Sequence, residues 1–244
     1  MTTRTNSSMT QTNWDLIRDA ASGSETARRS LDSVARRAWP AVFAFIRASG
    51  RTPEDATELT QGFIADVFLS RHLLEKADPA RGRFRTLLIG AVRNYLSDMH
   101  RRRTASTRMP KGGITAFDDA VEGSVDGRAH RDDSPERAFN TRYVAGLIRG
   151  AAERLQQQLL AEGDAATWEL FRVRVMQASF EGSAAGYDTL APQLGLSKGE
   201  CAGRLVVAKR RFAALLLDEV RATVQSDDDA RTEMIELMKL LEQR

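Results

Sequence analysis

The sequence lacks most of the features that mark membrane, secreted and disulfide-bonded proteins. Cys201 is the single cysteine among 244 residues. No intramolecular disulfide can therefore form, and a reducing compartment such as the cytosol fits best. No apolar run approaches the roughly 18 residues that span a membrane. The first thirteen residues are rich in Ser and Thr and contain no apolar core of a secretory signal. We therefore expect a cytoplasmic protein without a membrane partner.

Signals of catalysis and metal binding are also missing. The three histidines, His72, His100 and His130, lie in different segments and lack the spacing of metal ligands. The sequence contains no nucleophile elbow, P-loop, HExxH or GxGxxG motif. Catalytic triads assemble in space, so an enzyme is not excluded, but nothing local favours one. We expect a protein that is not an enzyme and that needs no cofactor.

Charge is unevenly distributed, although the net charge is small. The 36 Lys and Arg residues only slightly outnumber the 33 Asp and Glu residues. Residues 76–111 contain ten Lys or Arg residues and two acids, whereas residues 115–136 contain seven acids and two arginines. A basic block of this density indicates a polyanionic partner such as nucleic acid, and the acidic block indicates a different role.

The hydrophobic pattern predicts an all-α fold, because apolar residues recur at steps of three and four and no alternating strand pattern is present. The first predicted helix covers about 24–48 and contains Pro40, which we expect to kink or split it. The second begins with Thr52 as N-cap and Pro53 at its first position, and the third covers about 84–103. These helices predict a compact first domain.

A second helical domain is expected after a linker. Residues 105–134 are rich in Gly, Ser, Asp and Arg without periodicity, which predicts a flexible acidic linker. Further helices are predicted near 135–161, 164–181, 187–194 and 197–219, and an amphipathic helix near 228–243 carries Met234, Leu237, Met238 and Leu241. The expected organisation is a disordered tail at 1–23, a first domain at 24–104, the linker at 105–134, a second domain at 135–225 and the C-terminal helix at 226–244.

The most specific local signal is the run YDTLAPQLGLSKGECAGRLVVAKRRF, from Tyr187 to Phe212. A short helix ending at Gly195, a tight turn and a longer helix with Ser197 as N-cap have the spacing of a helix-turn-helix, whose second helix enters the major groove. That second helix carries five cations, Lys198, Arg204, Lys209, Arg210 and Arg211, and one acid, Glu200. The alternative is an ordinary helical hairpin with a solvated basic face. Cys201 is best explained as a small, semi-buried filler.

A second signal surrounds the helix predicted at 84–103. Cations, an asparagine and aromatic residues are interleaved along it: Arg83, Phe84, Arg85, Arg93, Asn94, Tyr95 and Arg101–Arg103. Cations hold phosphates and aromatic faces stack on unpaired bases, so the pattern is typical of a nucleic-acid-binding surface. The last three arginines also fit a solvated helix end favoured by the helix dipole, but that alternative leaves the rest of the basic block unexplained.

Three segments together resemble the sigma-70 family of RNA polymerase sigma factors, in its extracytoplasmic-function group. The run DATELTQ, from Asp55 to Gln61, is similar to the DAEDLTQ signature of sigma region 2. Residues 84–103 are similar to the helix FRxWLxxIARNxxxDxxRR that follows it, and the Tyr187–Phe212 run is similar to the region 4 pattern YxxIAxxLGxSxGxVKxxxxRARxxL. The resemblance covers most of 25–105 and 135–225 in the family's order, and the layout is most similar to the larger factors of planctomycete-type bacteria.

The resemblance implies a role for each of these segments. Region 2 would bind the clamp of core RNA polymerase and would open and read the minus-ten promoter element, and region 4 would read the minus-thirty-five element. The implied polymerase-binding residues are Asp55, Glu58, Leu59 and Gln61. The implied DNA-binding residues are the loop Asp78–Arg83 with Arg85, Arg93, Asn94, Arg101 and Arg102 in region 2, and Lys198, Glu200, Arg204 and Lys209 in region 4. We expect Arg204 to reach base edges or phosphate, with a base contact as the hypothesis to test, and Lys209 to contact phosphate only. The implied partners are core RNA polymerase, promoter DNA and, as a further candidate, an anti-sigma factor.

The sequence also departs from the family pattern. Gly62 stands where an acid is usual, which costs about 1 kcal/mol of helix propensity and is expected to weaken a clamp contact. Leu87 replaces a frequent tryptophan, which reduces the aromatic help in melting DNA. Glu200 and Cys201 stand where Thr or Val and Lys are common, so promoter specificity cannot be transferred from the family.

Two other functional classes remain open. A helix-turn-helix regulator that never joins polymerase would use the second domain but would leave the DATELTQ helix without a purpose. An adaptor that binds partners through its terminal helix would explain residues 228–243 and little else. For the linker, a place in the basic channel of polymerase, as in the family, and a simple tether between two domains both fit.

Overall fold

The structure is a computed structural model that describes residues 25–69, 83–107, 134–177, 185–224 and 226–242. All regular secondary structure in these ranges is helical, which confirms the predicted all-α fold. The predicted tail at 1–23, most of the loop Asp78–Arg83 and residues 108–133 of the predicted linker lie outside the described residues. Contacts divide the described chain into two compact units, one from Met1–Gly146 with Ala222–Arg244 and one from Leu147–Arg221.

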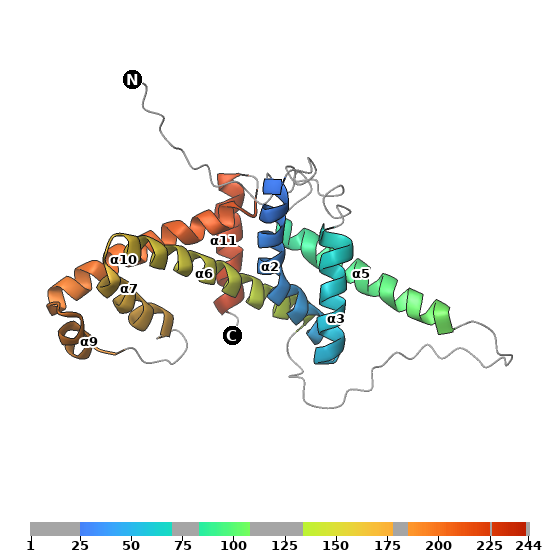
Figure 1. Ribbon diagram of the computed structural model, residues 1–244, viewed down its shortest axis with the longest axis horizontal. Helices are drawn as coiled ribbons and strands as arrows, with labels where there is room; N and C mark the ends of the chain where they lie inside the picture. Colours follow the sequence, from blue (N-terminus) through green and yellow to red (C-terminus); the bar gives the residue numbers. More distant parts are fainter. Residues whose placement is uncertain (1–24, 70–82, 108–133, 178–184, 225, 243–244) are drawn as a thin grey trace, which may run out of the picture. The chain divides into compact units, whose positions relative to one another are not determined.

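The first unit packs helices from both ends of the described chain around one core. In chain order its elements are α2 (Glu25–Ala48), α3 (Pro53–Phe63), the π-helical turn η1 (Ile64–Leu69), α5 (Phe84–Thr107), the first part of α6 (Pro135–Ala161) and α11 (Asp227–Glu242) (Figure 1). Val42, Ile46, Phe63 and Leu88 are among its fully buried side chains. The helix α5 extends beyond its expected end, so that residues 105–107, which were assigned to the linker, are helical.

Pro40 does not split the first helix, because α2 is one helix from Glu25 to Ala48 with Pro40 inside it. The expectation of a split at this residue is therefore wrong. A proline in a helix interior costs about 3 kcal/mol, since it removes a backbone hydrogen bond and crowds the preceding turn. The residues that follow it, Ala41 and Val42, are fully buried. Their burial stabilises the helix on the far side of the proline.

The start of α3 confirms the predicted capping signal. The Thr52 hydroxyl accepts a hydrogen bond from the Asp55 backbone N–H at 3.1 Å, and Pro53 occupies the first helical position, where its missing N–H costs nothing. Ala56, Leu59 and Phe63 form the buried face of this helix.

Gly62 on α3 has a packing role that the sequence did not reveal. A Cβ atom at this position would lie 2.3 Å from the hydroxyl of Tyr95 on α5. Tyr95 packs edge-on against Phe63, with ring centroids 5.8 Å apart, so it has little freedom to retreat. The glycine therefore lets α5 approach α3 closely, and this contact compensates for its poor helix propensity.

The second unit is a helical hairpin packed on further helices. It contains the rest of α6, then α7 (Ala165–Phe171), the π-helical turn η3 (Arg172–Gln177), α9 (Tyr187–Leu194) and α10 (Lys198–Arg221). Its core is formed by Leu155, Leu159, Leu170, Phe171, Leu190, Cys201, Leu205 and Ala208. The ring centroids of Phe171 on α7 and Phe212 on α10 are 5.1 Å apart, and this contact packs α10 against α7.

The C-terminal helix α11 belongs to the first unit and not to the second. Residues 135–146 also group with the first unit, although the sequence assigned them to a second domain at 135–225. The buried face of α11 contains Ala230, Glu233 and Leu237, whereas Met238, expected on the apolar face, is 54% exposed. The buried face of α11 is therefore rotated relative to the expected apolar face and includes the carboxylate of Glu233.

Candidate nucleic-acid interface

The turn between α9 and α10 has the local geometry that its sequence predicts. Gly195 ends α9 in the left-handed conformation, with φ of +66°, which an L side chain would strain. The Leu196 N–H then bonds to the Ala191 carbonyl at 2.9 Å. The Ser197 hydroxyl accepts a hydrogen bond from the Glu200 N–H at 3.2 Å, and the Glu200 carboxylate accepts one from the Ser197 N–H at 2.8 Å. This reciprocal capping box defines the start of α10.

The inner face of α10 is apolar and closely packed. Cys201 and Ala208 are fully buried and Leu205 is 4% exposed, so the three lie on the side of α10 that contacts the unit's core. Leu205 and Ala208 thus face inward, and Cys201 fills space in the core as expected, although it is fully buried and not semi-buried. Because an α-helix turns by about 100° per residue, this inner face determines which side chains of α10 point outward.

Two arginines of α10 bind acids of their own unit. Arg204 forms an ion pair with Asp164 at 2.8 Å, and Arg211 forms one with Glu162 at 2.7 Å. Asp164 is also the N-cap of α7 and accepts a hydrogen bond from the Thr167 N–H at 3.1 Å. Burial acts to raise the pKa of Asp164, but the hydrogen bonds from Thr167 and the charge of Arg204 outweigh it, and the pKa is lowered. Arg204, the expected base reader, therefore lies at the edge of the inner face.

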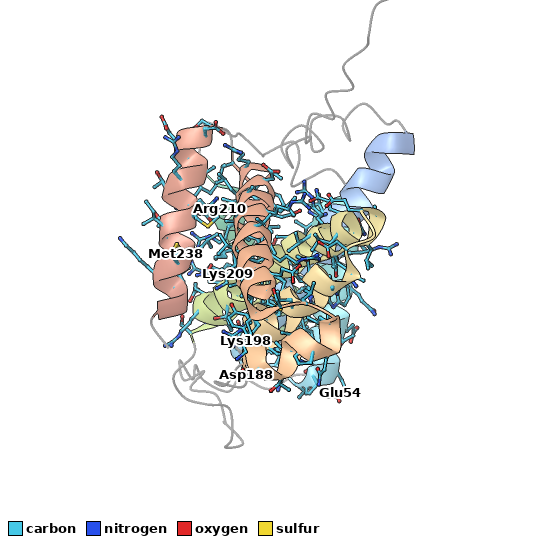
Figure 2. The ribbon with its side chains drawn as sticks, turned by 90° about the vertical axis from the view of Figure 1, so that its left-hand side faces the viewer. Glu54, Asp188, Lys198, Lys209, Arg210 and Met238 are labelled. Atoms are coloured by element: carbon cyan, nitrogen blue, oxygen red, sulfur yellow. The ribbon has the colours of Figure 1, made fainter. Side chains whose placement is uncertain are left out.

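The outward face of α10 combines unpaired cations with exposed valines. Lys209 and Arg210 are exposed and have no acidic partner among the described residues. Val206 and Val207 are 49% and 52% exposed. Figure 2 shows Lys209 and Arg210 along α10, and Lys198 at its start, next to Asp188 of α9, with which it forms an ion pair. Glu200 is exposed at the same end and serves the cap.

The implied polymerase-binding residues lie on more than one face of α3. Glu58 and Gln61 are exposed, as a contact with another protein requires. Leu59 is 8% exposed and belongs to the core, so its side chain is not available at the surface. Asp55 is half-buried in the first turn, where its N–H bonds to the Thr52 hydroxyl.

The first two arginines of α5 are held by the C-terminal helix. Arg85 donates to both oxygens of Glu233, at 2.8 and 3.2 Å, and to the Asn140 side-chain oxygen at 2.8 Å. Arg83 forms ion pairs with Glu233 at 2.9 Å and with Glu236. The side chain of Glu233 is only 1% exposed and that of Arg85 only 11%. Both arginines are thus neutralised within the first unit. We call these five residues the Arg85–Glu233 network.

The electrostatics of the network follow from its geometry. The hydrogen bond from Arg83 lowers the pKa of Glu236, and the same bond raises the pKa of Arg83. A further ion pair joins Arg93 to Glu136 of α6, and the hydrogen bond from Arg93 lowers the pKa of that carboxyl. Both carboxyl groups, Glu136 and Glu236, are therefore charged at neutral pH.

The remaining implied DNA contacts lie on the exposed part of α5. Asn94, Arg101 and Arg102 are exposed, and Arg101 pairs with Asp98 three residues before it. Sequence reasoning missed Glu233, Glu236 and Asn140, since nothing in the sequence indicates contacts across such separations. It also missed Val206 and Val207, although the helical phase set by the buried positions 201, 205 and 208 places them outward.

In the described ranges, no group of three or more His, Cys, Asp or Glu side chains could hold a metal ion. None of the helices in those ranges combines the length and apolarity of a membrane span. Comparisons of the chain with protein-family models, with curated proteins and with solved structures find no match.

Proposed function

We propose that this protein is a sigma factor, which binds core RNA polymerase and directs it to promoters from the cytoplasm. The observation that carries the proposal is the α9–α10 helix-turn-helix, whose outer face presents Lys209, Arg210 and two valines. Such a surface suits the major groove, because an α-helix fits its width and cations flanking it can hold phosphates. On this reading the protein is not an enzyme, and its partners are core polymerase and promoter DNA.

The exposed side chains of α3 support the polymerase contact. Glu58 and Gln61 point outward while Ala56, Leu59 and Phe63 hold the helix against the core. A rigid helix with an outward polar pair is suited to binding another protein without local rearrangement. The run DATELTQ on this helix is the segment that resembles the clamp-binding signature.

A helix-turn-helix regulator that does not join polymerase is the second candidate, and one observation favours it. Opening a duplex requires cations and aromatic residues that can hold a displaced base. In the first unit Arg83 and Arg85 are bound by Glu233 and Glu236, and Phe84 is 2% exposed. A regulator would need only the second unit to bind DNA, and the ion pairs of this network would stay formed.

Co-purification with core RNA polymerase distinguishes the two candidates. For a sigma factor, the full chain should elute with core polymerase. The double variant Glu58→Lys with Gln61→Ala should elute separately, with its helicity by circular dichroism unchanged. Glu54→Lys is the matched control, since it makes the same charge change on an exposed side chain of the same helix. A full chain that never associates with core polymerase contradicts the sigma proposal.

A promoter-opening assay then tests the function itself. Permanganate oxidises unpaired thymines, so a sigma factor with core polymerase should produce reactive thymines near the minus-ten element. Arg93→Ala with Asn94→Ala should reduce this reactivity while duplex binding persists. Protein that binds promoter duplex but never produces reactive thymines supports the regulator.

A further inference from the structure

The outer face of α10 is built differently from a surface that reads bases with polar side chains. The cation expected to reach base edges, Arg204, is bonded to Asp164 and Thr167 at the edge of the inner face. Val206 and Val207 lie on the outer face, and each is about half exposed. Glycine and alanine occupy the preceding turns on this side.

The charges of the second unit single out the same face. Lys198, Arg204 and Arg211 of α10 are each neutralised by an acid of the unit. Lys209 and Arg210 follow the two valines along α10, and no carboxylate of the described chain pairs with them (Figure 2). An apolar pair beside two free cations is complementary to a groove whose floor has an apolar group and whose walls carry phosphates.

The glycines on this face allow a close approach. A Cβ atom at Gly199 or Gly203 would meet nothing of the protein within 4 Å, so the fold itself does not require glycine there. Both lie in the N-terminal part of α10, before the valines. In helix-turn-helix proteins this part of the second helix contacts base edges in the major groove. The backbone of α10 can therefore lie nearer to base edges than a helix with larger outward side chains.

We infer that α10 recognises thymine through Val206 and Val207, which pack against the 5-methyl group that only thymine presents in the major groove, while Lys209 and Arg210 hold the flanking phosphates. Thymine is the base suited to such a surface, since the other three bases offer only donors and acceptors there. Two valines are too small an apolar area to anchor a lipid surface. The inference rests on the proposed DNA binding by α10 and adds to it the chemical group that is read.

The test replaces thymine by deoxyuridine, which keeps the base pair and lacks only the 5-methyl group. Duplexes are selected from a random library by the full chain, alone and with core polymerase, and the enriched duplex is resynthesised with deoxyuridine at one thymine at a time. Loss of a contacted methyl group should weaken binding about fourfold. Val207→Ala and Val206→Ala should each lower affinity for the thymine duplex by a similar factor.

Combining Val207→Ala with the deoxyuridine duplex shows whether the Val207 side chain contacts the thymine methyl group. If Val207 contacts the methyl group, Val207→Ala should lose most of its effect on the deoxyuridine duplex, because the partner group is already absent. Leu160→Ala is the matched control: Leu160 is 49% exposed on α6 of the same unit and should leave both affinities unchanged. Lys209→Ala should weaken both duplexes equally.

The outcomes separate this inference from the proposed function. Equal affinity for thymine and deoxyuridine duplexes, or selection of sites without a thymine preference, overturns thymine recognition. If binding still falls with salt and with Lys209→Ala, DNA binding by α10 stands. If the full chain binds no duplex at all, with or without polymerase, both the proposed function and this inference fail.

Discussion

The substitution Glu233→Gln tests whether the Arg85–Glu233 network holds the C-terminal helix on the first unit. Glu233 is 1% exposed and accepts hydrogen bonds from Arg85 at 2.8 and 3.2 Å, and it forms an ion pair with Arg83 at 2.9 Å. Gln keeps the size of the side chain but removes its charge. Two arginines then share the single carboxylate of Glu236 in a partly buried site.

The expected cost follows from this geometry. Removing one partner of a buried ion pair generally costs about 3–5 kcal/mol, because the other charge stays buried without compensation. Arg85 retains its bonds to Asn140 and Glu236, so we expect the lower end, about 3 kcal/mol. Glu236→Gln is the control, since its side chain is 44% exposed and its loss should cost less than about 1 kcal/mol.

Hydrogen exchange followed by peptide is the suitable assay, because it reports the opening of each helix separately. Protection of α11 and of the start of α5 should fall by about a hundredfold in Glu233→Gln. Protection of the α9–α10 hairpin, which lies in the other unit, should stay unchanged. Equal effects of Glu233→Gln and Glu236→Gln, or full protection of α11 in both, would refute the reasoning.

Three further predictions concern other contacts. Gly62→Ala should destabilise the first unit by about 1–3 kcal/mol in urea denaturation, because its Cβ would lie 2.3 Å from the Tyr95 hydroxyl, and a neutral or stabilising effect would contradict this contact. Arg204→Ala should destabilise the second unit and change DNA affinity little, because Arg204 pairs with Asp164. Arg210→Ala should leave stability unchanged and reduce the slope of log affinity against log salt concentration by about one unit, measured by fluorescence anisotropy. The reverse pattern would restore Arg204 as the DNA contact. The pKa of Glu236 is lower in the folded protein than its ordinary value of 4.5, so this carboxylate contributes its full stability above pH 4.5 and loses that contribution as the pH falls through the folded-state pKa. The difference in unfolding free energy between the wild type and Glu236→Gln should therefore shrink in acid. A difference that does not vary with pH contradicts this prediction.

The sequence predicted best the features whose causes lie within a few residues of one another. The start of α3 follows from Thr52 and Pro53, and the turn before α10 follows from Gly195 and Ser197. Each signal acts on backbone groups no more than four residues away, so the rest of the chain is not needed to interpret it. For the same reason the described helices lie close to their expected positions.

Side-chain direction on α10 was predictable in part. The buried positions Cys201, Leu205 and Ala208 set the phase of the helix, and that phase alone places Arg210 outward and Arg204 at the inner edge. Net charge was a poorer guide, because it counts a cation without showing which acid lies beside it. Asp164 and Glu162 lie 40 and 49 residues before the arginines that they bind.

The sequence by itself determined the helical fold, the caps, the helix-turn-helix spacing and the two buried faces, because local hydrogen bonding and hydrophobic periodicity decide these. Only the tertiary structure decided which charges are free. Arg85 and Glu233 are 148 residues apart, and no periodicity or capping rule connects them. Their pairing depends on where α11 packs, and that packing is what converts two apparent DNA contacts into a neutralised, partly buried network.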